Sequence, residues 1–519
     1  MSDPSDLGSD IAHFYRGRSV FITGASGFMG KVLIEKLLRS CPGISNIYCL
    51  MRPKSGNDVK TRLADILNTT VFDGLRRENP EVFNKVVPIT GDISSPNLGI
   101  CAADHKMLCE SVSVVFHSAA TVKFDEPLKF SVSLNVLGTK SLVQLCQKME
   151  NLEAVVHVST AYCNCDRTEV NESLYPPPAD PEKILNYAEY LDEEILDTLT
   201  PSLIQNRPNT YTYTKALAEH VFVKLGKGLP AAIVRPSIVT AAWKEPLPGW
   251  VDNLNGPTGL LAGAGKGVLR TLLCYKDLVA DLIPVDVAIN ALIAVAWHTA
   301  VSRPDNIVIY NCTSGKLNPI HWKDIQRYGQ ESILRVPFRE IIWYPGGSFK
   351  SSHIVNDVCV SLFQIIPAYI LDTVYRITGR KPIMVRIQKK FSKAIKALQF
   401  FTTHEWHFES NNIAKLYSKL SERDKELFNF NIKQVNWRKY MENYILGIKQ
   451  FILKDDASSL QEAKNNLRKY YMIHKATQIL FYIVMWRFLL MRSEKARQIW
   501  FSLWSITVRL LRLVPFISS

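Results

Sequence analysis

The stretch Ser19-Val-Phe-Ile-Thr-Gly-Ala-Ser-Gly-Phe-Met-Gly30 decides the fold of this chain. Its first five residues form a short apolar run with β-branched side chains, which predicts a buried strand. Three glycines follow at once, and the segment 31–38 then shows the helical spacing of apolar residues. A strand, a glycine-rich turn and a helix in this order are the context that a dinucleotide-binding fingerprint requires.

The glycines predict how this turn would hold a dinucleotide. Gly24 permits the tight turn, Gly27 lets backbone N–H groups approach the pyrophosphate, and Gly30 lets the helix pack close to the strand. The positive end of the helix dipole adds to phosphate binding. We therefore expect cofactor contacts along the whole turn, from Thr23, Gly24, Ser26, Gly27, Phe28, Met29 and Gly30.

The second predicted strand, residues 46–51, ends at a basic residue. An acidic residue usually binds the free ribose 2′-hydroxyl of NADH at this point, whereas this chain has Arg52, followed by Lys54. A guanidinium suits a 2′-phosphate, so the sequence favours NADPH. The alternative interpretation of Arg52 is an ordinary solvated loop charge.

Four further apolar runs, at 85–90, 113–116, 154–158 and 231–235, predict that a parallel sheet continues along the chain. This pattern indicates an α/β protein with a Rossmann-type, doubly wound parallel sheet. Strand ends in such a sheet face the ligand crevice. Asp92, at one of these strand ends, is either a candidate acceptor for the adenine amino group or simply a turn residue. The small side chains of Ala119 and Ala120 would let the dinucleotide lie against the backbone. Pro236 completes the expected cofactor contacts.

Tyr211 and Lys215 form the candidate catalytic pair. Their spacing places both side chains on one face of a helix. An isolated phenol has a pKa of about 10, and a nearby ammonium lowers it; Lys215 can also donate to the nicotinamide ribose. A hydroxyl from Ser159 or Thr160, at the end of the preceding strand, would orient the substrate oxygen. Together these groups surround a developing oxyanion with donors.

Two alternatives accompany this catalytic interpretation. The Tyr-x-x-x-Lys spacing also arises by chance, and Tyr213 is a second tyrosine on the same segment. The fingerprint and the Ser-Thr strand end upstream are what favour catalysis. Asn135 either holds a water that supports Lys215 or is a helix residue whose polar groups are satisfied within the protein.

Longer motifs resemble those of animal alcohol-forming fatty acyl-CoA reductases, in the extended short-chain dehydrogenase/reductase superfamily. The motifs are Thr23–Pro42, His157–Tyr162, Asn209–Glu219 and Trp243–Pro257, and the similarity runs through nearly the whole chain, including a C-terminal region from about 361 to 453. The resemblance implies reduction of a long-chain fatty acyl-CoA by two NADPH, through a bound aldehyde, to a primary alcohol and coenzyme A. The strand-end register of related enzymes favours Thr160 over Ser159. Enzymes that stop at the aldehyde, or that act on another lipid such as a sterol, are the alternatives.

Composition limits the other classes of function. The chain has 519 residues, a net charge of +14 and ten scattered cysteines without paired CxxC motifs, so we expect no metal site. No nucleic-acid-binding motif accompanies the positive charge, whereas coenzyme A and NADPH are both polyanions. The polar, acidic N-terminus is not a secretory signal. The segment Gly263–Gly267 lacks the Ser/Thr of a phosphate-binding loop and is expected to be a loop over the acyl-CoA entrance.

The chain divides into three expected units: an NADPH-binding reductase domain over 14–355, a helical domain over 356–456 and a hydrophobic, basic membrane anchor over 470–519. In the helical domain, apolar faces that include Ile366, Tyr369 and Ile370 would pack on the sheet domain or line a slot for the acyl tail. The anchor contains two apolar stretches, 479–491 and 500–511, and ten Lys and Arg occur between residues 462 and 512. Each is shorter than the ~20 residues of a full span.

The topology of this tail stays open from the sequence. A single span, a re-entrant hairpin, an interfacial helix pair and a soluble amphipathic helix all fit its pattern. We expect an intracellular membrane, of peroxisome or endoplasmic reticulum, with the catalytic domain facing the cytosol. A homo-oligomer is neither required nor excluded.

Overall fold

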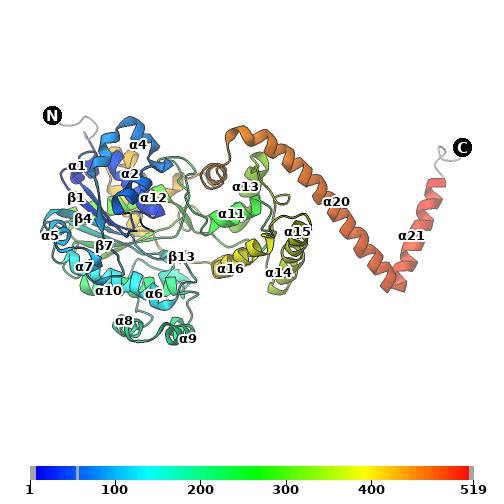
Figure 1. Ribbon diagram of the computed structural model, residues 1–519, viewed down its shortest axis with the longest axis horizontal. Helices are drawn as coiled ribbons and strands as arrows, with labels where there is room; N and C mark the ends of the chain where they lie inside the picture. The colour runs from blue at the N-terminus through cyan, green and yellow to red at the C-terminus, as the bar shows by residue number, and fades with distance from the viewer. Residues whose placement is uncertain (1–7, 54–55, 57, 513–519) are drawn as a thin grey trace.

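The computed structural model describes residues 8–53, 56 and 58–512. Lys54, residues 1–7 and the end of the expected anchor, 513–519, lie outside the described residues. At the centre is a seven-stranded, all-parallel sheet in the order β3-β2-β1-β4-β5-β7-β11 (Figure 1). Its strands are β1 Ser19–Thr23, β2 Ile47–Met51, β3 Val86–Thr90, β4 Val112–His117, β5 Ala154–Val158, β7 Ala231–Pro236 and β11 Val308–Cys312.

This sheet confirms the predicted Rossmann-type, doubly wound α/β class. Every strand expected from the sequence is present with its ends within one residue of the expected ones. The sheet also has a strand that the sequence analysis did not predict, β11, which pairs in parallel with β7 along its whole length. Successive residues of β1 point to opposite faces: Val20 and Ile22 belong to one buried cluster and Phe21 to another. Helices therefore cover both faces.

The helices of this region connect and cover the strands. Those of the first half are α1 Asp10–Tyr15, α2 Phe28–Ser40, α3 Val59–Leu67, α4 Asp73–Glu78, α5 Ala102–Ser111, α6 Leu128–Val132 and α7 Gly138–Cys146. Those of the second half are α8 Pro181–Tyr190, α9 Glu193–Ile204, α10 Thr210–Leu225 and α12 Val285–Ser302. The apolar helix α12 is long enough to span a membrane, but it is mostly buried and packs on β5, β7 and α2. It is a core helix of the sheet domain.

A smaller lobe lies beside the sheet. It contains two short parallel strand pairs, β8 Ile238–Thr240 with β10 Leu282–Pro284 and β9 Thr271–Leu273 with β12 Ser348–Lys350. It also contains α11 Pro257–Gly265 and α13 Trp322–Arg335. The segment Gly263–Gly267, expected to be a loop, forms the last turn of α11 and the two residues after it. Gly263 and Gly265 face the rings of Phe391 and Phe338, where a Cβ would lie within 2.5 Å of a ring carbon.

The C-terminal region is not a separate bundle. Its helices are α14 His353–Val360, α15 Ile366–Ile377, α16 Met384–Thr402, α17 Asn411–Lys419, α18 Glu422–Leu427 and α19 Trp437–Gly447. Ile413 of α17 and Tyr440 of α19 belong to the same buried cluster as Val20 of β1. Asp424 of α18 accepts a hydrogen bond of 2.6 Å from Ser9, the residue before α1. The C-terminal helices thus complete the core of the N-terminal domain.

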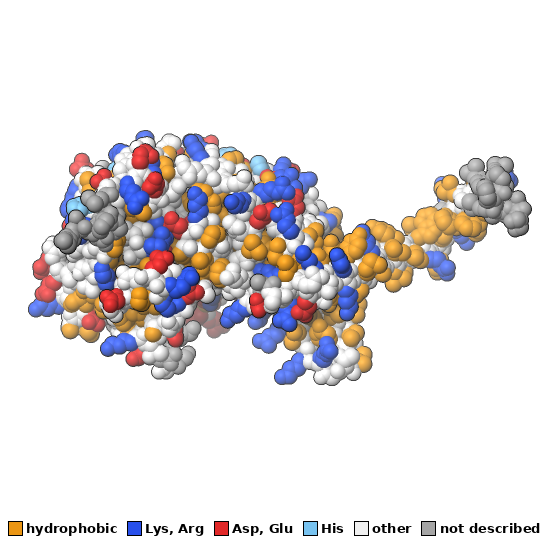
Figure 2. Space-filling model, turned by 90° about the horizontal axis from the view of Figure 1, so that it is seen from above, with side chains coloured by type: hydrophobic (Ala, Val, Ile, Leu, Met, Phe, Trp, Pro, Cys, Tyr) orange, Lys and Arg blue, Asp and Glu red, His pale blue; other side chains and the backbone are white. Residues whose placement is uncertain are grey.

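The expected unit boundaries at 355 and 470 both fall inside helices. A short π-helical turn, Ser361–Ile365, joins α14 and α15 into one continuous helix, His353–Ile377. Residue 470 lies within α20, Leu460–Arg492, which turns at Ser493 into α21, Glu494–Arg512. These two tail helices project from the body in a V (Figure 1), and hydrophobic side chains cover them (Figure 2).

Candidate active site

The glycine-rich turn between β1 and α2 forms an open backbone cradle. Gly24 has φ of +80°, and a Cβ there would lie 2.8 Å from the backbone of Ser118 and Ala119, which follow β4. A Cβ on Gly30 would lie 2.3 Å from the Gly24 carbonyl oxygen, so only glycine lets α2 pack on the turn. Gly27 caps α2 without a side chain. The cradle matches the residues that the fingerprint assigns to a pyrophosphate.

A chain of hydrogen bonds supports this cradle from below. Thr23 Oγ1 accepts from the Ala119 N–H at 3.2 Å and lies 2.8 Å from His117 Nδ1. His117 Nε2 lies 2.9 Å from Thr139 Oγ1, whose proton goes to the Asn135 carbonyl. This order assigns the proton of a neutral His117 to Nε2. Burial lowers the pKa of His117 to about 3, with Lys215 adding to the effect.

The remaining turn residues have different surroundings. Thr23 is fully buried, so its side chain stabilises the turn instead of facing the crevice. Ser26 accepts a hydrogen bond from Arg62 at 3.2 Å. Phe28 stacks on Trp250 at 5.5 Å between ring centroids, and Phe28 and Met29 pack against the main core. Pro236 is the buried last residue of β7.

The predicted catalytic pair lies at the start of α10. The Asn209 side chain caps this helix by accepting from the Thr212 N–H at 2.9 Å. Lys215 is buried, and its ammonium donates to the Val158 carbonyl at the end of β5 at 2.7 Å. The helix therefore holds Tyr211 and Lys215 against the strand end that carries Ser159 and Thr160.

The prediction that the Lys215 ammonium lowers the pKa of Tyr211 is wrong. Burial raises this pKa to about 12, and a hydrogen bond with the Thr160 hydroxyl opposes the rise only in part. The ammonium that was expected to lower it is bonded instead to the Val158 carbonyl. Burial also lowers the pKa of Lys215 to about 8, against the attraction of Glu219. At neutral pH the site thus holds a protonated phenol beside an ammonium.

The two strand-end hydroxyls have different partners. Thr160 interacts with Tyr211 and also caps the short turn after β5 by accepting from the Tyr162 N–H at 3.3 Å. Ser159 lies beside Glu219, but its buried hydroxyl makes no hydrogen bond of normal geometry within the described residues. Of the two hydroxyls, that of Thr160 is therefore the better placed to act together with the phenol.

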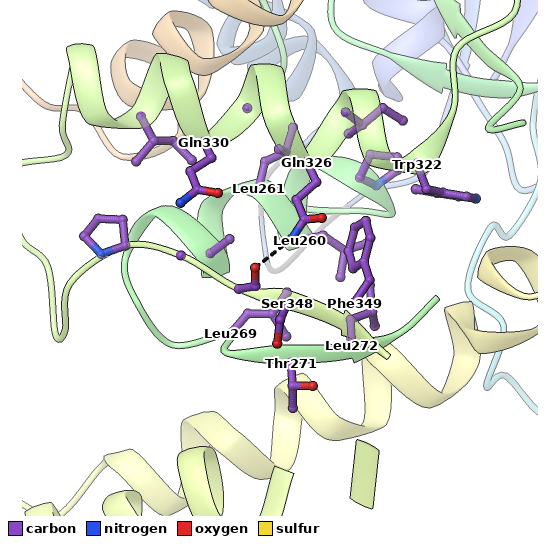
Figure 3. A pocket seen from close by; sticks show the side chains of 18 residues that line it. Leu260, Leu261, Leu269, Thr271, Leu272, Trp322, Gln326, Gln330, Ser348 and Phe349 are labelled. Carbon is purple, nitrogen blue, oxygen red and sulfur yellow. Dashed lines mark hydrogen bonds between the residues drawn. The ribbon is translucent and has the colours of Figure 1, made fainter. Parts of the chain in front are cut away.

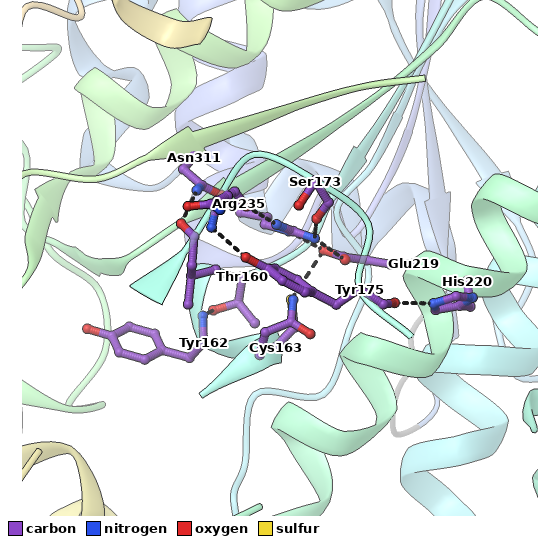
Figure 4. Close-up of polar contacts among 12 residues, drawn as sticks. Thr160, Tyr162, Cys163, Ser173, Tyr175, Glu219, His220, Arg235 and Asn311 are labelled. Carbon is purple, nitrogen blue, oxygen red and sulfur yellow. Dashed lines mark hydrogen bonds and ion pairs between the residues drawn. The ribbon is translucent and has the colours of Figure 1, made fainter. Parts of the chain in front are cut away.

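A buried ion pair that the sequence did not predict joins Glu219 of α10 to Arg235 of β7 (Figure 4). Glu219, one turn after Lys215, accepts two hydrogen bonds from Arg235, at 2.8 and 2.7 Å, and both side chains are at most 2% exposed. Arg235 also donates to the carbonyls of Asn171 and Ser173. Burial would raise the pKa of Glu219, but the guanidinium outweighs it and holds this pKa below its ordinary value.

Asn135 has partners for its whole side-chain amide. Its Oδ1 accepts from the Thr121 N–H at 3.0 Å, and its Nδ2 donates to Thr214 Oγ1 at 2.9 Å. It lies in a π-helical turn, Ser133–Leu137, that packs on α10. Of the two interpretations, the geometry matches a satisfied polar group.

Two arginines, one of them not expected, flank the open end of the cradle. Arg52 is 53% exposed and lies 3.5 Å from Asp92, which also accepts from Ser94 in a turn. Arg62 of α3 donates to the Arg52 carbonyl and to Ser26. Arg62 thus lies beside the glycine-rich turn and next to the Arg52 backbone. Within the described residues, Asp92 is the ion-pair partner of the half-exposed Arg52 guanidinium.

Aromatic side chains from the C-terminal region reach Phe124, which lies against the candidate catalytic residue Tyr211. Phe124 lies 5.8 Å from Tyr211 and 5.3 Å from Phe401 of α16, between ring centroids. Tyr162 contacts Phe401 and Trp406 edge to face. These rings form one buried apolar cluster, which gives the site a water-excluding wall.

A narrow apolar pocket of about 70 Å³ opens in the smaller lobe, between α11, α13 and the β9–β12 pair (Figure 3). Leucine side chains of α11 and β9 line it together with Trp322 and Phe349. Gln326 lies at its edge and donates to the Gly347 carbonyl at 2.6 Å. No group of three or more His, Cys, Asp or Glu that could hold a metal ion occurs in the part of the chain that the structure describes.

Comparisons with known proteins found similar families, relatives and solved structures. Two family models described as "Male sterility protein", one of them an NAD-binding family, match residues 22–292 and 363–455. Fatty acyl-CoA reductase 1 of Gallus gallus is 43% identical over 501 residues, which cover 96% of this chain and 97% of the relative. Fatty acyl-CoA reductase 2 of Mus musculus is 43% identical over 493 residues, covering 95% and 96%.

Among solved structures, the reductase domain of a nonribosomal peptide synthetase from Mycobacterium tuberculosis shares the fold. Its TM-score is 0.57 at 18% identity, and the match covers 86% of this chain and 93% of that domain. At this identity the likeness concerns the fold alone.

Proposed function

The chain belongs to the fatty acyl-CoA reductase family, and from that premise we propose that it reduces a long-chain fatty acyl-CoA to a primary alcohol with NADPH. The observation that carries the proposal is the position of Tyr211, Thr160 and Lys215. They meet at the carboxyl end of β5, and the glycine-rich turn follows the carboxyl end of β1 on the same side of the sheet. Ligands of such sheets bind beyond the carboxyl ends of the strands.

In this proposal the residues act on the carbonyl oxygen in both reductions. Bound NADPH supplies one hydride to the carbonyl carbon each time. Tyr211 and Thr160 donate hydrogen bonds to the tetrahedral oxyanion of the thioester, which collapses with release of the coenzyme A thiolate. Tyr211 then protonates the alkoxide formed from the aldehyde. Its raised pKa suits this role, because the phenol is protonated before the reaction and acts as an acid.

The two arginines support NADPH as the cofactor. A 2′-phosphate next to the glycine-rich turn would lie within reach of Arg52 and Arg62, and guanidiniums bind phosphate through paired hydrogen bonds. Replacing Arg52 or Arg62 by Ala is therefore expected to raise KM for NADPH by roughly tenfold, the effect of about 1.4 kcal/mol of lost binding. KM for NADH should change little, because NADH has no phosphate there. Initial rates with each cofactor measure the difference. Arg77→Ala, at an exposed arginine of α4, is the control, and equal losses for both cofactors would contradict the assignment.

The substrate assignment draws on the apolar surfaces around the site. The aromatic wall of Phe124 and Phe401 excludes water from the carbonyl, and the pocket between α11 and α13 is lined for an alkyl chain. The excess positive charge suits the phosphates of coenzyme A.

The stoichiometry of the reaction tests this function. Reduction of one thioester to the alcohol takes up two hydrides and two protons and yields one alcohol, one free coenzyme A thiol and two NADP⁺. We expect two NADPH consumed for each thiol released from a long-chain acyl-CoA, measured by absorbance and thiol titration, with the alcohol as the extracted product. One NADPH for each thiol, with accumulation of aldehyde, would instead support an enzyme that stops at the aldehyde.

We also propose that the enzyme works at an intracellular membrane, of peroxisome or endoplasmic reticulum, with its catalytic domain in the cytosol. The exposed apolar side chains of α20 and α21 and their ten Lys and Arg support this. A long-chain alcohol is poorly soluble, so release next to a bilayer suits the product. Neither tail helix is among the described helices that are long and apolar enough to span a membrane. An interfacial helix pair is the topology that we favour.

A further inference from the structure

The continuous helix His353–Ile377 exposes its apolar side chains to solvent and turns polar side chains to the protein. Its exposed face carries ten large apolar residues, each 46–81% exposed. They are Ile354, Val355, Val358, Leu362, Phe363, Ile366, Tyr369, Ile370, Val374 and Ile377. A contiguous exposed apolar face of this kind is uncommon on soluble monomers and marks a site of contact with a protein or a membrane. The sequence predicted this apolar face but placed it against the protein.

The face turned to the protein carries polar residues instead. Asn356 accepts from the Thr271 hydroxyl of β9 at 3.3 Å, and Gln364 accepts from the Arg270 N–H at 3.0 Å. Asp372 accepts from the backbone N–H groups of Met384 and Val385 at the start of α16. These three polar side chains are at most 8% exposed. Because one side of the helix is hydrogen-bonded to the enzyme, the helix cannot cross a bilayer alone, although it is long and apolar enough.

A basic segment accompanies the apolar face. Between Thr373 and His404 there are eight Lys and Arg and no Asp or Glu. Five of these cations, Arg386, Lys389, Lys390, Lys393 and Lys396, lie exposed on α16, which packs on α15. Of them, Lys393 is paired with Asp125. Hydrophobic and basic side chains occur together at the end of the molecule from which the tail projects (Figure 2).

We propose that the exposed face of His353–Ile377 and the basic helix α16 form an interfacial docking surface for an anionic lipid bilayer. The apolar residues would enter the boundary between headgroups and acyl chains, and the cations would bind lipid phosphates. A second copy of the chain fits less well, because a two-fold interface would place the same cations close together. This docking surface is also continuous with the tail, since the ring centroids of Phe363 and Phe481 of α20 lie 6.4 Å apart.

Docking in this way would give the enzyme two attachments to the bilayer. The tail helices are one, and the helix tied to β9 is the other. Because β9 also lines the apolar pocket, the second attachment would place the catalytic body, and not only the tail, against the lipid.

Site-specific photo-crosslinking in the full-length chain tests the proposal. Tyr369→p-benzoylphenylalanine places the probe on the proposed docking surface. Tyr190→p-benzoylphenylalanine places it on α8, outside the docking surface, at a tyrosine that is 78% exposed to solvent. Each protein is floated with phosphatidylcholine vesicles, with and without phosphatidylserine, and then illuminated. We expect a lipid adduct at position 369 and only background adduct formation at position 190. The adduct should increase when phosphatidylserine is present.

Three outcomes would overturn the proposal. The first is a chain that floats with vesicles but forms no lipid adduct at Tyr369, since the tail alone would then hold it. The second is an equal lipid adduct at both positions. The third is a crosslink at Tyr369 between two protein chains, which would identify a second copy as the partner. Ile366→Glu with Ile370→Glu should reduce the adduct at Tyr369, whereas Ile195→Glu with Leu199→Glu, at exposed residues of α9, should not.

Discussion

Replacing Tyr211 by Phe is expected to lower kcat for acyl-CoA reduction by roughly 10²–10⁴-fold, the usual contribution of a positioned general acid. The substitution removes only the hydroxyl that protonates the reduced oxygen. The ring remains, so the contact with Phe124 and the packing of the site are retained. Affinity for NADPH should stay nearly unchanged, because the glycine cradle and the arginines are untouched. Steady-state rates and a cofactor titration measure the two effects separately.

Tyr213 provides a matched control for this experiment. It lies on the same helix, two residues away, and is fully buried in a different apolar cluster. Tyr213→Phe removes an equivalent hydroxyl that has no hydrogen-bond partner among the described residues, so activity should remain. If Tyr211→Phe kept its activity, or if both variants lost it equally, the proton-donor role of Tyr211 would be refuted.

Replacing Glu219 by Gln is expected to lower the free energy of unfolding by about 3–5 kcal/mol, because it leaves the Arg235 guanidinium buried without its counter-ion. The pair is almost completely shielded from water, so solvent cannot compensate. Denaturant titration of the variant and the unmodified protein measures the loss. Replacing both residues by apolar ones, Glu219→Leu with Arg235→Met, should recover much of it, because no unpaired charge then remains.

The same substitution should change the pH dependence of catalysis. Burial lowers the pKa of Lys215 to about 8, and the Glu219 carboxylate already opposes this lowering. Activity that needs the ammonium is present below this pKa and is lost as pH rises through it. Without the carboxylate the pKa is lower, so the loss should begin at a lower pH. Glu182→Gln breaks an exposed pair with Lys140 and serves as the control; it should cost at most ~1 kcal/mol and leave the pH profile unchanged.

The sequence was informative wherever a local pattern determines the structure. Strands buried on both faces appear as β-branched apolar runs, and three glycines between a strand and a helix are typical of a dinucleotide-binding turn. Tyr211 and Lys215 could be paired because the helical period alone places them together. The seventh strand, Val308–Cys312, was missed because the smaller lobe and α12 separate it from β7, so no local pattern connects it to the sheet.

Contacts between distant segments were not predictable in the same way. Arg62 reaches Ser26 across 36 residues, and Phe401 joins the catalytic wall only because the C-terminal region folds back over the sheet. For His353–Ile377, periodicity revealed an apolar face but not which way it points. Burial of Asn356, Gln364 and Asp372 on the opposite side decides that question, and it depends on partners elsewhere in the chain. The rise in the pKa of Tyr211 is likewise caused by burial, which the spacing of residues in the sequence does not reveal.

The shared core has a consequence for biosynthesis. Side chains from Ile413 to Ile448 pack in the same cluster as Val20, and Asp424 holds the start of α1. The core around the first βαβ unit is therefore complete only after residues up to about 448 have been translated, and the apolar surface that these residues cover stays exposed on the nascent chain until then.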